Sequence, residues 1–510
     1  MGALRARAHS CEHRNCWEDR FIVSTMLGID VGTSSVKVVL IDDTQRVLAS
    51  ATSPLKLARP EEGWSEQNPE DWWRAMLAAV GAVQKQKRKS FEAVEAIGLS
   101  GQMHGATLID AADKPIRPAI LWNDGRSEKE CRALEEKEPS LRKIAGNIAM
   151  PGFTAPKLLW VKAHEPQNFK KTAKVLLPKD YIRLKLSGDY ASDMSDSSGT
   201  LWMDVGRRKW SEKLLAATDL GLDHMPKLYE GTAPTGELSA ALQKKWGLTR
   251  RPAIAGGGGD NAAAACGIGA VKPNESFISI GTSGVLFVTN DKFSPNTGNA
   301  VHAFCHAVPD TWHQMGVMLS AAASMEWLSG ILGKPVQRLM ASLKEKLEGP
   351  APVTFLPYLS GERTPVNDAR ARGVFIGLGH DSDRRVLTQA VLEGVAFGFR
   401  DCLEALKTAG TRIERATAVG GGSKSKLWLK IIATVLGIDI EVPAAGDFGA
   451  AFGAARLGLA ALDKGSDLNA LSRPKMALRI APDDRLRSSY EAGYERYRKI
   501  YPAVKGFDFA

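Results

Sequence analysis

From residue 26 onward, the chain alternates short apolar or β-branched runs with longer stretches of helical spacing. The short runs predict strands, because apolar runs of about four to eight residues between turn residues are typical of strands. Residues 69–86 predict a helix. Asn68 can cap it, and Pro69 suits its first position. The alternation of strands and helices predicts an α/β protein.

The two halves of the chain repeat one pattern. Residues 27–42 and 276–290 each predict a strand, a tight turn and a second strand. The stretches IDVGTSSV at 29–36 and ISIGTSGV at 278–285 share five of their eight residues. This repeat predicts two domains of like topology, at 26–270 and 271–510. Residues 1–25 show no periodic pattern, and we expect them to form a disordered tail.

Further elements follow the same style in both halves. Strands are predicted at 46–57, 94–100, 106–110 and 439–443, and a helix at 449–463. Residues 251–271 and 417–437 each predict a strand, a glycine-rich turn and a helix.

Composition is ordinary for a globular protein, with 44% hydrophobic and 24% charged residues. No apolar run is long enough to span a bilayer. The six cysteines are scattered, which suits a reducing cytoplasm better than a disulfide framework. We therefore expect a cytoplasmic protein with no membrane partner.

The formal net charge of +10 raises the question of nucleic-acid binding. The densest basic run, KQKRKS at 85–90, follows a helical stretch and has no interleaved aromatic residues. It is typical of a solvated helix end. No nucleic-acid motif accompanies it, so we expect no nucleic-acid partner. A basic surface also attracts anionic small molecules.

The repeated Gly-Thr-Ser turn offers backbone N–H groups and short hydroxyls, a suitable surface for phosphate oxygens. A single copy would be a simple hairpin turn, whereas two facing copies could grip a polyphosphate. Only the first copy carries a carboxylate, Asp30, where the second has Ser279. Because phosphate-bound Mg²⁺ needs a carboxylate, directly or through water, the pattern predicts a metal side and a hydrogen-bonding side.

Two further glycine turns carry open alternatives. VGGGS at 419–423 is either a tight connection or a surface for a flat ligand such as adenosine. GGGGDN at 256–261 places Asp260 at a helix start, where it is either an N-cap or a base facing a substrate. Neither GxGxxG nor GxxxxGK[ST] occurs, which argues against a dinucleotide fold and a Walker-type site. We interpret His302 and His306 as packed strand residues, with a metal pair as the alternative.

The motifs together resemble the FGGY family of carbohydrate kinases, within the actin-like ATPase (ribonuclease H-like) superfold. GIDVGTSSVK and ISIGTSGV resemble the two phosphate motifs of the family, and AVGGGSKSKLW resembles its adenosine motif. The resemblance runs from residue 26 to near the C-terminus. It implies two α/β domains with a cleft between them for ATP and a sugar.

Other stretches resemble the family members that act on D-xylulose: SGQMHGATLID, AILWNDGRS, MPGFTAPKLLWV, LLPKDYIRLKLSG, ASDMSDSSGT and LPYLSGERTP. The resemblance implies ATP-dependent phosphorylation of D-xylulose to its 5-phosphate. The alternatives are a kinase of ribulose, another polyol or gluconate, a sugar-sensing protein without activity, and an actin-like chaperone ATPase. One departure is the run of four glycines before Asp260, where two or three are expected.

Carried over by position, the resemblance assigns each candidate residue a role. Met103 and His104 would contact the sugar, with Trp122 and Asn261 as further candidates. Asp260 would accept the proton, and Asp30 would act through Mg²⁺ and the phosphates. The residues that would line the nucleotide are Thr33, Gly281, Thr282, Gly421 and Gly422. The resemblance also implies a homodimer.

Overall fold

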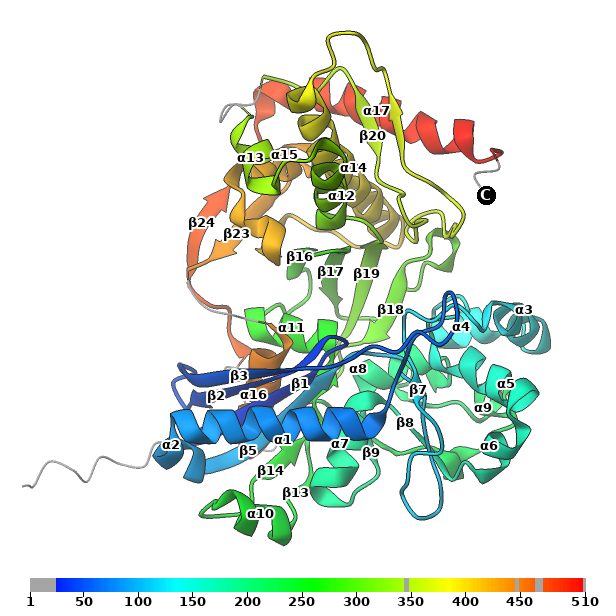
Figure 1. The fold of residues 1–510 in the computed structure, drawn as a ribbon, viewed down its shortest axis with the longest axis vertical. Coiled ribbons are helices and arrows are strands. Elements are labelled where there is room, and N and C mark those ends of the chain that lie inside the picture. The colour runs from blue at the N-terminus through cyan, green and yellow to red at the C-terminus, as the bar shows by residue number, and fades with distance from the viewer. Residues whose placement is uncertain (1–23, 344–347, 445–448, 464–470, 508–510) are drawn as a thin grey trace, which may run out of the picture.

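The computed structural model describes residues 24–343, 348–444, 449–463 and 471–507. They form two lobes, one above the other in Figure 1, each built on a seven-stranded sheet. The expected mixed α/β architecture with two sheets is confirmed. Of the tail predicted at 1–25, residues 1–23 lie outside the described residues. The first strand begins at Thr25, one residue earlier than expected.

The N-terminal lobe contains the first sheet, in the order β13-β14-β5-β1-β2-β3, with β15 also paired to β5. β1, β2 and β3 are antiparallel neighbours, whereas β5 is parallel to β1 and to β14. The strands are β1 (Thr25–Val31), β2 (Ser35–Asp42), β3 (Val47–Pro54), β5 (Val94–Gly101), β13 (Pro234–Glu237), β14 (Ala253–Ala255) and β15 (Gly258–Gly259).

The second sheet repeats that topology in the order β18-β19-β17-β16-β22-β23-β24. β16 pairs antiparallel with β17 and parallel with β22, just as β1 pairs with β2 and β5. The strands are β16 (Ser276–Ile280), β17 (Gly284–Asn290), β18 (His302–Cys305), β19 (Trp312–Met318), β22 (Arg415–Val419), β23 (Asp439–Pro443) and β24 (Met476–Ile480). The sequence repeat is therefore a repeat of strand order and direction.

The two repeated turns are not identical. Val31 lies opposite Val36, so residues 32–35 form the first turn, whereas Ile280 lies opposite Gly284, so only residues 281–283 form the second. A Cβ atom at Gly284 would lie 2.6 Å from Met318 Cγ. This crowding explains why glycine replaces the serine of the first copy.

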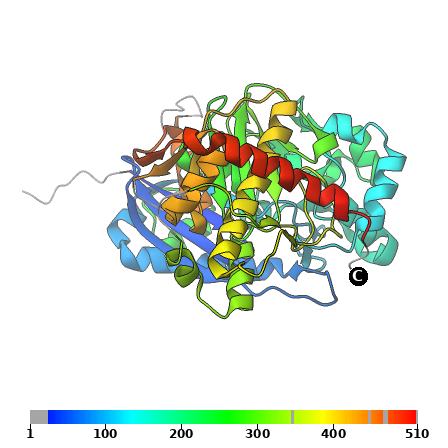
Figure 2. The ribbon, with the colours of Figure 1, turned by 90° about the horizontal axis from the view of Figure 1, so that it is seen from above.

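Helices cover both sheets (Figure 1). In the N-terminal lobe they are α1 (Pro69–Gln86), α2 (Arg88–Glu92), α3 (Glu128–Lys137), α4 (Leu141–Ala145), α5 (Thr154–His164), α6 (Pro166–Lys171), α7 (Pro178–Ser187), α8 (Met194–Ser197), α9 (Glu212–Ala217), α10 (Ala240–Trp246) and α11 (Asp260–Ile268). Those of the second half are α12 (Ala322–Leu332), α13 (Val336–Ala341), α14 (Arg384–Thr408), α15 (Lys426–Leu436), α16 (Ala450–Leu462) and α17 (Arg487–Val504). Figure 2 shows α17 crossing the top of the C-terminal lobe.

Short strand pairs complete the fold around the sheets. They are β4 (Glu66–Gln67) with β7 (Ala119–Ile120), β6 (Thr107–Ile109) with β8 (Lys174–Leu176), β9 (Ala191–Asp193) with β12 (Lys227–Tyr229), β10 (Met203–Asp204) with β11 (Lys209–Trp210), and β20 (Thr354–Leu356) with β21 (Val374–Ile376). Among the helices that the structure describes, none combines the length and apolar content needed to cross a bilayer.

Helix α16 lies in the predicted C-terminal domain by sequence but packs on the first sheet (Figure 1). A Cβ atom at Gly28 of β1 would lie 1.9 Å from Ala451 O, and one at Gly98 of β5 1.7 Å from Ala454 O. Only glycine permits such close backbone packing. On its other side α16 contacts α11, where Arg456 donates to the carbonyl of Cys266. The domain boundary expected near residue 270 remains a prediction.

Candidate active site

The two predicted catalytic carboxylates lie at the same end of the first sheet. Asp30 stands opposite Ser100 of β5, and Gly258 and Gly259 pair with Ser100 and Gly101 on the other side of that strand. Asp260 follows directly. Two strand spacings separate the strands of the two residues, about 10 Å in total. Asp260 is nevertheless close enough to Asp30 for its charge to raise the pKa of Asp30.

Asp260 is the first residue of α11, not its N-cap. The cap position is Gly259, and no side chain caps the helix. The Asp260 Oδ1 atom instead accepts from the backbone N–H of Asn261 at 2.8 Å and from its Nδ2 at 3.0 Å. The alternative that Asp260 serves as an N-cap is therefore wrong. Burial raises its pKa to about 6, which leaves the group mostly ionised at neutral pH.

Asp30 has a buried Oδ1 atom without a hydrogen-bond partner. Burial and the Asp260 charge raise the pKa of Asp30 to about 7, against the opposing effects of Ser100 and Lys37. Two nearby carboxylates with raised pKa values and an unpartnered oxygen fit a cation. Clusters of three or more His, Cys, Asp or Glu side chains suited to a metal are absent from the described residues. Such a cluster is not required, since Mg²⁺ usually binds through one or two carboxylates plus substrate phosphates.

The run of four glycines forms a bulge. Residues 255–257 lie between the pairs made by Ile254 and Gly258, opposite only residues 98–99 of β5. Gly257 has φ +79°, and a Cβ atom there would lie 2.2 Å from Leu99 O. This stretch therefore has one residue more than the facing part of β5, as in a β-bulge, and Asp260 follows it.

Met103 and His104 follow β5 and reach the same place. A Cβ atom at Gly259 would lie 2.9 Å from Met103 Cγ, so the methionine packs against the turn that carries Asp260. Met103 is buried. His104 lies within hydrogen-bond distance of Gly199, with 2.7 Å between Nδ1 and the carbonyl oxygen. The structure therefore brings Met103 to the turn before Asp260, and His104, the next residue, to Gly199.

His104 is held in an unusual backbone conformation, with φ +69°. Its carbonyl accepts from Lys157 Nζ at 2.9 Å and from the Thr154 hydroxyl at 3.2 Å. Burial and the neighbouring Lys157 charge lower the pKa of His104 to about 3, so the ring is neutral at physiological pH. A non-glycine residue fixed at positive φ stores strain that is typical of functional sites.

The first phosphate turn is hydrogen-bonded to the sugar-pocket candidate Trp122 and to two residues that were not predicted as site residues, Gln67 and Gln102. The Thr33 hydroxyl donates to Gln102 Oε1 at 2.9 Å and accepts from Trp122 Nε1 at 3.0 Å. The Thr33 carbonyl accepts from Gln67 Nε2 at 2.7 Å. The Thr33 hydroxyl is therefore bound by two residues from outside the turn, Gln102 and Trp122. Gln102 lies within the quoted GQMHG stretch, but no pattern distinguished Gln67.

The second phosphate turn and the 419–423 turn lie at the same end of the second sheet, because they follow the neighbouring parallel strands β16 and β22. A Cβ atom at Gly422 would lie 2.3 Å from Ile280 Cγ2, and Gly420 adopts φ +86° against the Ile280 carbonyl. Gly421 has open space where a side chain would point. The Thr282 carbonyl accepts from the N–H of Ala321 just before α12. The structure thus brings together four of the five expected nucleotide residues, Gly281, Thr282, Gly421 and Gly422, while Thr33 lies on the first turn.

A cavity of about 430 Å³ opens between the lobes, and of the candidate site residues its lining includes Trp122 alone. Trp122 and Gly152 line it from the N-terminal lobe, and Arg363 from the C-terminal lobe. The Arg363 guanidinium is 3.3 Å from His302 Nε2 and lowers the pKa of His104. Arg363 lies in the quoted LPYLSGERTP stretch, but its place beside His302 could not be read from the sequence.

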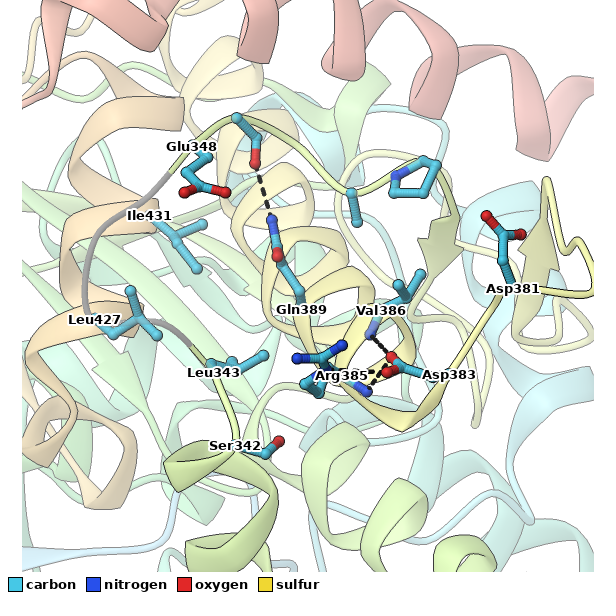
Figure 3. A pocket seen from close by; sticks show the side chains of 13 residues that line it. Ser342, Leu343, Glu348, Asp381, Asp383, Arg385, Val386, Gln389, Leu427 and Ile431 are labelled. Atoms are coloured by element: carbon cyan, nitrogen blue, oxygen red, sulfur yellow. Dashed lines mark hydrogen bonds and ion pairs between the residues drawn. The ribbon is translucent and has the colours of Figure 1, made fainter.

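A second cavity, of about 290 Å³, lies within the C-terminal lobe (Figure 3). Two of its polar side chains are hydrogen-bonded to the backbone of residues that line the same cavity. Asp383 accepts from the N–H groups of Arg385 and Val386, and Gln389 donates to the Gly349 carbonyl. None of the predicted site residues lines it. We assign it no part in the reaction.

The interpretation of His302 and His306 as packed residues is confirmed, but only His302 lies in a strand, β18, and His306 comes directly after its end. Both are buried, and His302 stacks on Phe304 at 5.4 Å between ring centroids. His306 meets Phe287 edge-on at 5.8 Å. The four described cysteines, Cys131, Cys266, Cys305 and Cys402, are buried and free.

Two family models match most of the chain. The N-terminal domain of the FGGY family of carbohydrate kinases matches residues 25–267, and the C-terminal domain of that family matches residues 276–462. The xylulose kinase of Escherichia coli K12 is 46% identical over 477 residues, which cover 93% of this chain and 98% of that protein. The xylulose kinase of Bacillus subtilis is 33% identical over 95% of this chain and 98% of its own length.

Solved structures show the same architecture. A crystal structure described as a xyloylose kinase from Brucella ovis superposes with a TM-score of 0.92 at 55% identity, covering 94% of this chain and 99% of that one. A gluconate kinase from Lactobacillus acidophilus has a TM-score of 0.86 at 23% identity, covering 95% and 99%. At that identity the likeness concerns the fold alone, so the fold does not distinguish one sugar from another.

Proposed function

The chain belongs to the FGGY family of carbohydrate kinases, and on that premise we propose that it transfers the γ-phosphoryl group of ATP to the 5-hydroxyl of D-xylulose. The products are D-xylulose 5-phosphate and ADP. The observation that carries the proposal is the pair of carboxylates, Asp30 and Asp260, at one end of the first sheet, with Met103 packed on the same turn. The full-length likeness to xylulose kinases supports D-xylulose as the sugar.

Asp260 acts as the general base. Its carboxylate accepts the proton of the 5-hydroxyl as that oxygen attacks the γ-phosphorus, and the bond from phosphorus to the bridging oxygen of ADP breaks. The Asn261 amide fixes the Oδ1 atom of this carboxylate. His104, neutral and held by Gly199, is suited to hydrogen-bond a sugar hydroxyl. Met103 supplies an apolar wall beside it.

The two phosphate turns hold ATP from both lobes. Backbone N–H groups of the first turn and of Gly281 and Thr282 suit phosphate oxygens. The open side of Gly421 leaves the backbone accessible to the nucleoside. Asp30 would hold Mg²⁺, with the ATP phosphates completing its ligands. The ion, when bound, neutralises charge on the transferred group.

Closure of the lobes excludes water that would compete with the sugar as acceptor. The Trp122 ring and the Arg363 guanidinium line the interlobe cavity from opposite lobes, so each lobe contributes to its wall. A sugar-sensing protein would not need the ionisable Asp260 in this turn, and a chaperone ATPase would not need His104 and Met103 as sugar contacts. A homodimer and a cytoplasmic location remain predictions.

The rate should depend on pH through Asp260. Because the base must be ionised and its pKa is raised to about 6, kcat/KM for the sugar should rise with pH and level off above that value. Below it, the rate should fall about tenfold per pH unit. A bound Mg²⁺ would favour the ionised forms of both Asp30 and the nearby Asp260, so higher Mg²⁺ should shift the acid limb to lower pH. Initial rates across pH 5 to 8 at two Mg²⁺ concentrations test this, and a flat profile would contradict it.

His104 should set the affinity for the sugar. His104→Asn tests this with little backbone strain, since asparagine tolerates the left-handed conformation. We expect KM for D-xylulose to rise about tenfold, the value of one hydrogen bond, with KM for ATP unchanged. Steady-state kinetics with each substrate varied in turn provide the measurement. A change in the ATP constant alone would remove His104 from the sugar pocket.

The substrate itself is tested by kcat/KM on a panel of D-xylulose, D-ribulose, xylitol, glycerol and D-gluconate. We expect D-xylulose to have the highest value. If another compound has a higher kcat/KM, the protein is still a kinase, but D-xylulose is not its preferred substrate.

A further inference from the structure

The turn before Asp260 is held by a buried segment that is remote in sequence, residues 191–200. The backbone N–H of Gly259, the residue before Asp260, donates to Ser195 Oγ at 3.1 Å. Ser195 Oγ in turn donates to Asp193 Oδ2 at 2.5 Å. Ser195 and Asp193 are both completely buried. A single side-chain hydroxyl therefore connects the turn before Asp260 to this segment.

The same segment also contacts the sugar side of the site. The carbonyl of Gly199 lies 2.7 Å from His104 Nδ1, and a Cβ atom at Gly199 would lie 3.0 Å from Met103 Cε. Residues 191–200 thus contact three of the groups expected to surround the sugar: Met103, His104 and the turn that carries Asp260. Of these contacts, the hydrogen bond from the Gly259 N–H to Ser195 involves the residue directly before Asp260.

A buried ion cluster makes this segment rigid. Lys179 of α7 is fully buried and pairs with Asp180 at 2.6 Å, Asp193 at 2.8 Å and Asp196 at 3.2 Å. From the same helix, Arg183 Nη2 donates to the Gly256 carbonyl at 2.7 Å, at the other end of the glycine run. The glycine run, which has no side chains of its own, is therefore fixed from outside by Arg183 and by Ser195.

We propose that Ser195 is a positioning residue for Asp260: through its bond to the Gly259 N–H, it fixes the start of α11 so that the carboxylate meets the attacking hydroxyl. The inference rests on the proposed role of Asp260 as the base. Ser195 is completely buried, and its effect passes through the turn. Glycines at 256–259 give the chain freedom to adopt the bulge, and the Ser195 bond restricts the freedom that remains.

Ser195→Ala removes the bond while keeping the volume almost unchanged. We expect kcat with D-xylulose to fall about tenfold to a hundredfold, since misplacing a catalytic group by about 1 Å can cost two orders of magnitude. KM for ATP should stay within about twofold. The matched control is Ser197→Ala, because Ser197 is equally buried and its hydroxyl donates to Ser192 Oγ at 2.9 Å, not to the turn. That variant should keep its kcat.

A double-mutant cycle separates positioning from a general loss of structure. If Ser195 acts through Asp260, adding Ser195→Ala to Asp260→Asn should lower kcat by less than about twofold, because the group being positioned is already gone. A general structural loss would lower kcat by the same factor in both backgrounds. Equal effects in the two backgrounds, or a kcat equal to that of Ser197→Ala, would overturn the inference.

One further variant and one preliminary measurement complete the test. Should Ser195→Ala fail to fold, Ser195→Cys replaces it, and a wild-type kcat in that folded variant would also overturn the inference. Wild-type turnover on the sugar panel is measured first. If another sugar is the better acceptor, the cycle is run on that sugar, so that an error in the proposed substrate is distinguishable from an error about Ser195.

Discussion

Asp260→Asn should lower turnover with D-xylulose by about two to four orders of magnitude, the range that general-base assistance typically contributes. The amide keeps the shape and the hydrogen bond to Asn261 but cannot accept the proton. The variant should melt at or above the wild-type temperature. Burial raises the pKa of Asp260, and burial together with the Asp260 charge raises the pKa of Asp30, so the two charges cost stability at neutral pH, and the substitution removes one of them.

The measurement is steady-state turnover together with a thermal melt. Asp110→Asn serves as the control, because Asp110 accepts from the backbone N–H groups of Ala112 and Lys114 in a turn and should affect stability alone. Near-normal turnover in Asp260→Asn would remove Asp260 as the base.

Asp30→Asn should slow phosphoryl transfer by about a hundredfold and raise the Mg²⁺ concentration needed for half-maximal rate. The substitution removes the carboxylate charge assigned to the ion, and electrostatic groups at the transferred phosphate are commonly worth this much. KM for the sugar should stay within about twofold, because no sugar contact is assigned to Asp30. Magnesium titrations of the initial rate at saturating sugar test the prediction.

Ser279→Ala is the matched control, since Ser279 occupies the equivalent position in the second copy of the turn. It should leave the Mg²⁺ dependence unchanged. If Asp30→Asn had wild-type magnesium dependence but weakened sugar binding, the role assigned to Asp30 would be wrong, and Asp30 would be a sugar-binding residue instead.

Much of the fold could be predicted because its signals are local. The strand-turn-strand repeat, the cap of α1 at Asn68 and the glycine turns were recognisable from short patterns, and the two sheets share their strand order as expected. The location of α16 could not be predicted. Its small residues predicted a helix, but the backbone contact with Gly28 and Gly98 joins segments more than 350 residues apart in the sequence.

In the site, too, local motifs were predictable and long-range contacts were not. Motifs brought Asp30, Met103, His104 and Asp260 into one hypothesis, and the structure places their elements together. The polar contacts behind them could not be predicted. Ser195 lies in the ASDMSDSSGT stretch, but nothing there distinguishes it from its neighbours, and Gln67 belongs to no motif; both act only through contacts made in the folded chain. Single hydrogen-bonding side chains of this kind are common on protein surfaces, and only burial and geometry distinguish them.

The central claim is sugar-dependent phosphoryl transfer, and its most direct measurement is ATP consumption by the wild-type protein with and without D-xylulose, with the product identified by phosphorus NMR. We predict slow ATP hydrolysis alone and a large stimulation by D-xylulose, with one D-xylulose 5-phosphate formed for each ATP consumed. ATP consumption that is equal with and without the sugar, or that yields only inorganic phosphate, would contradict the account.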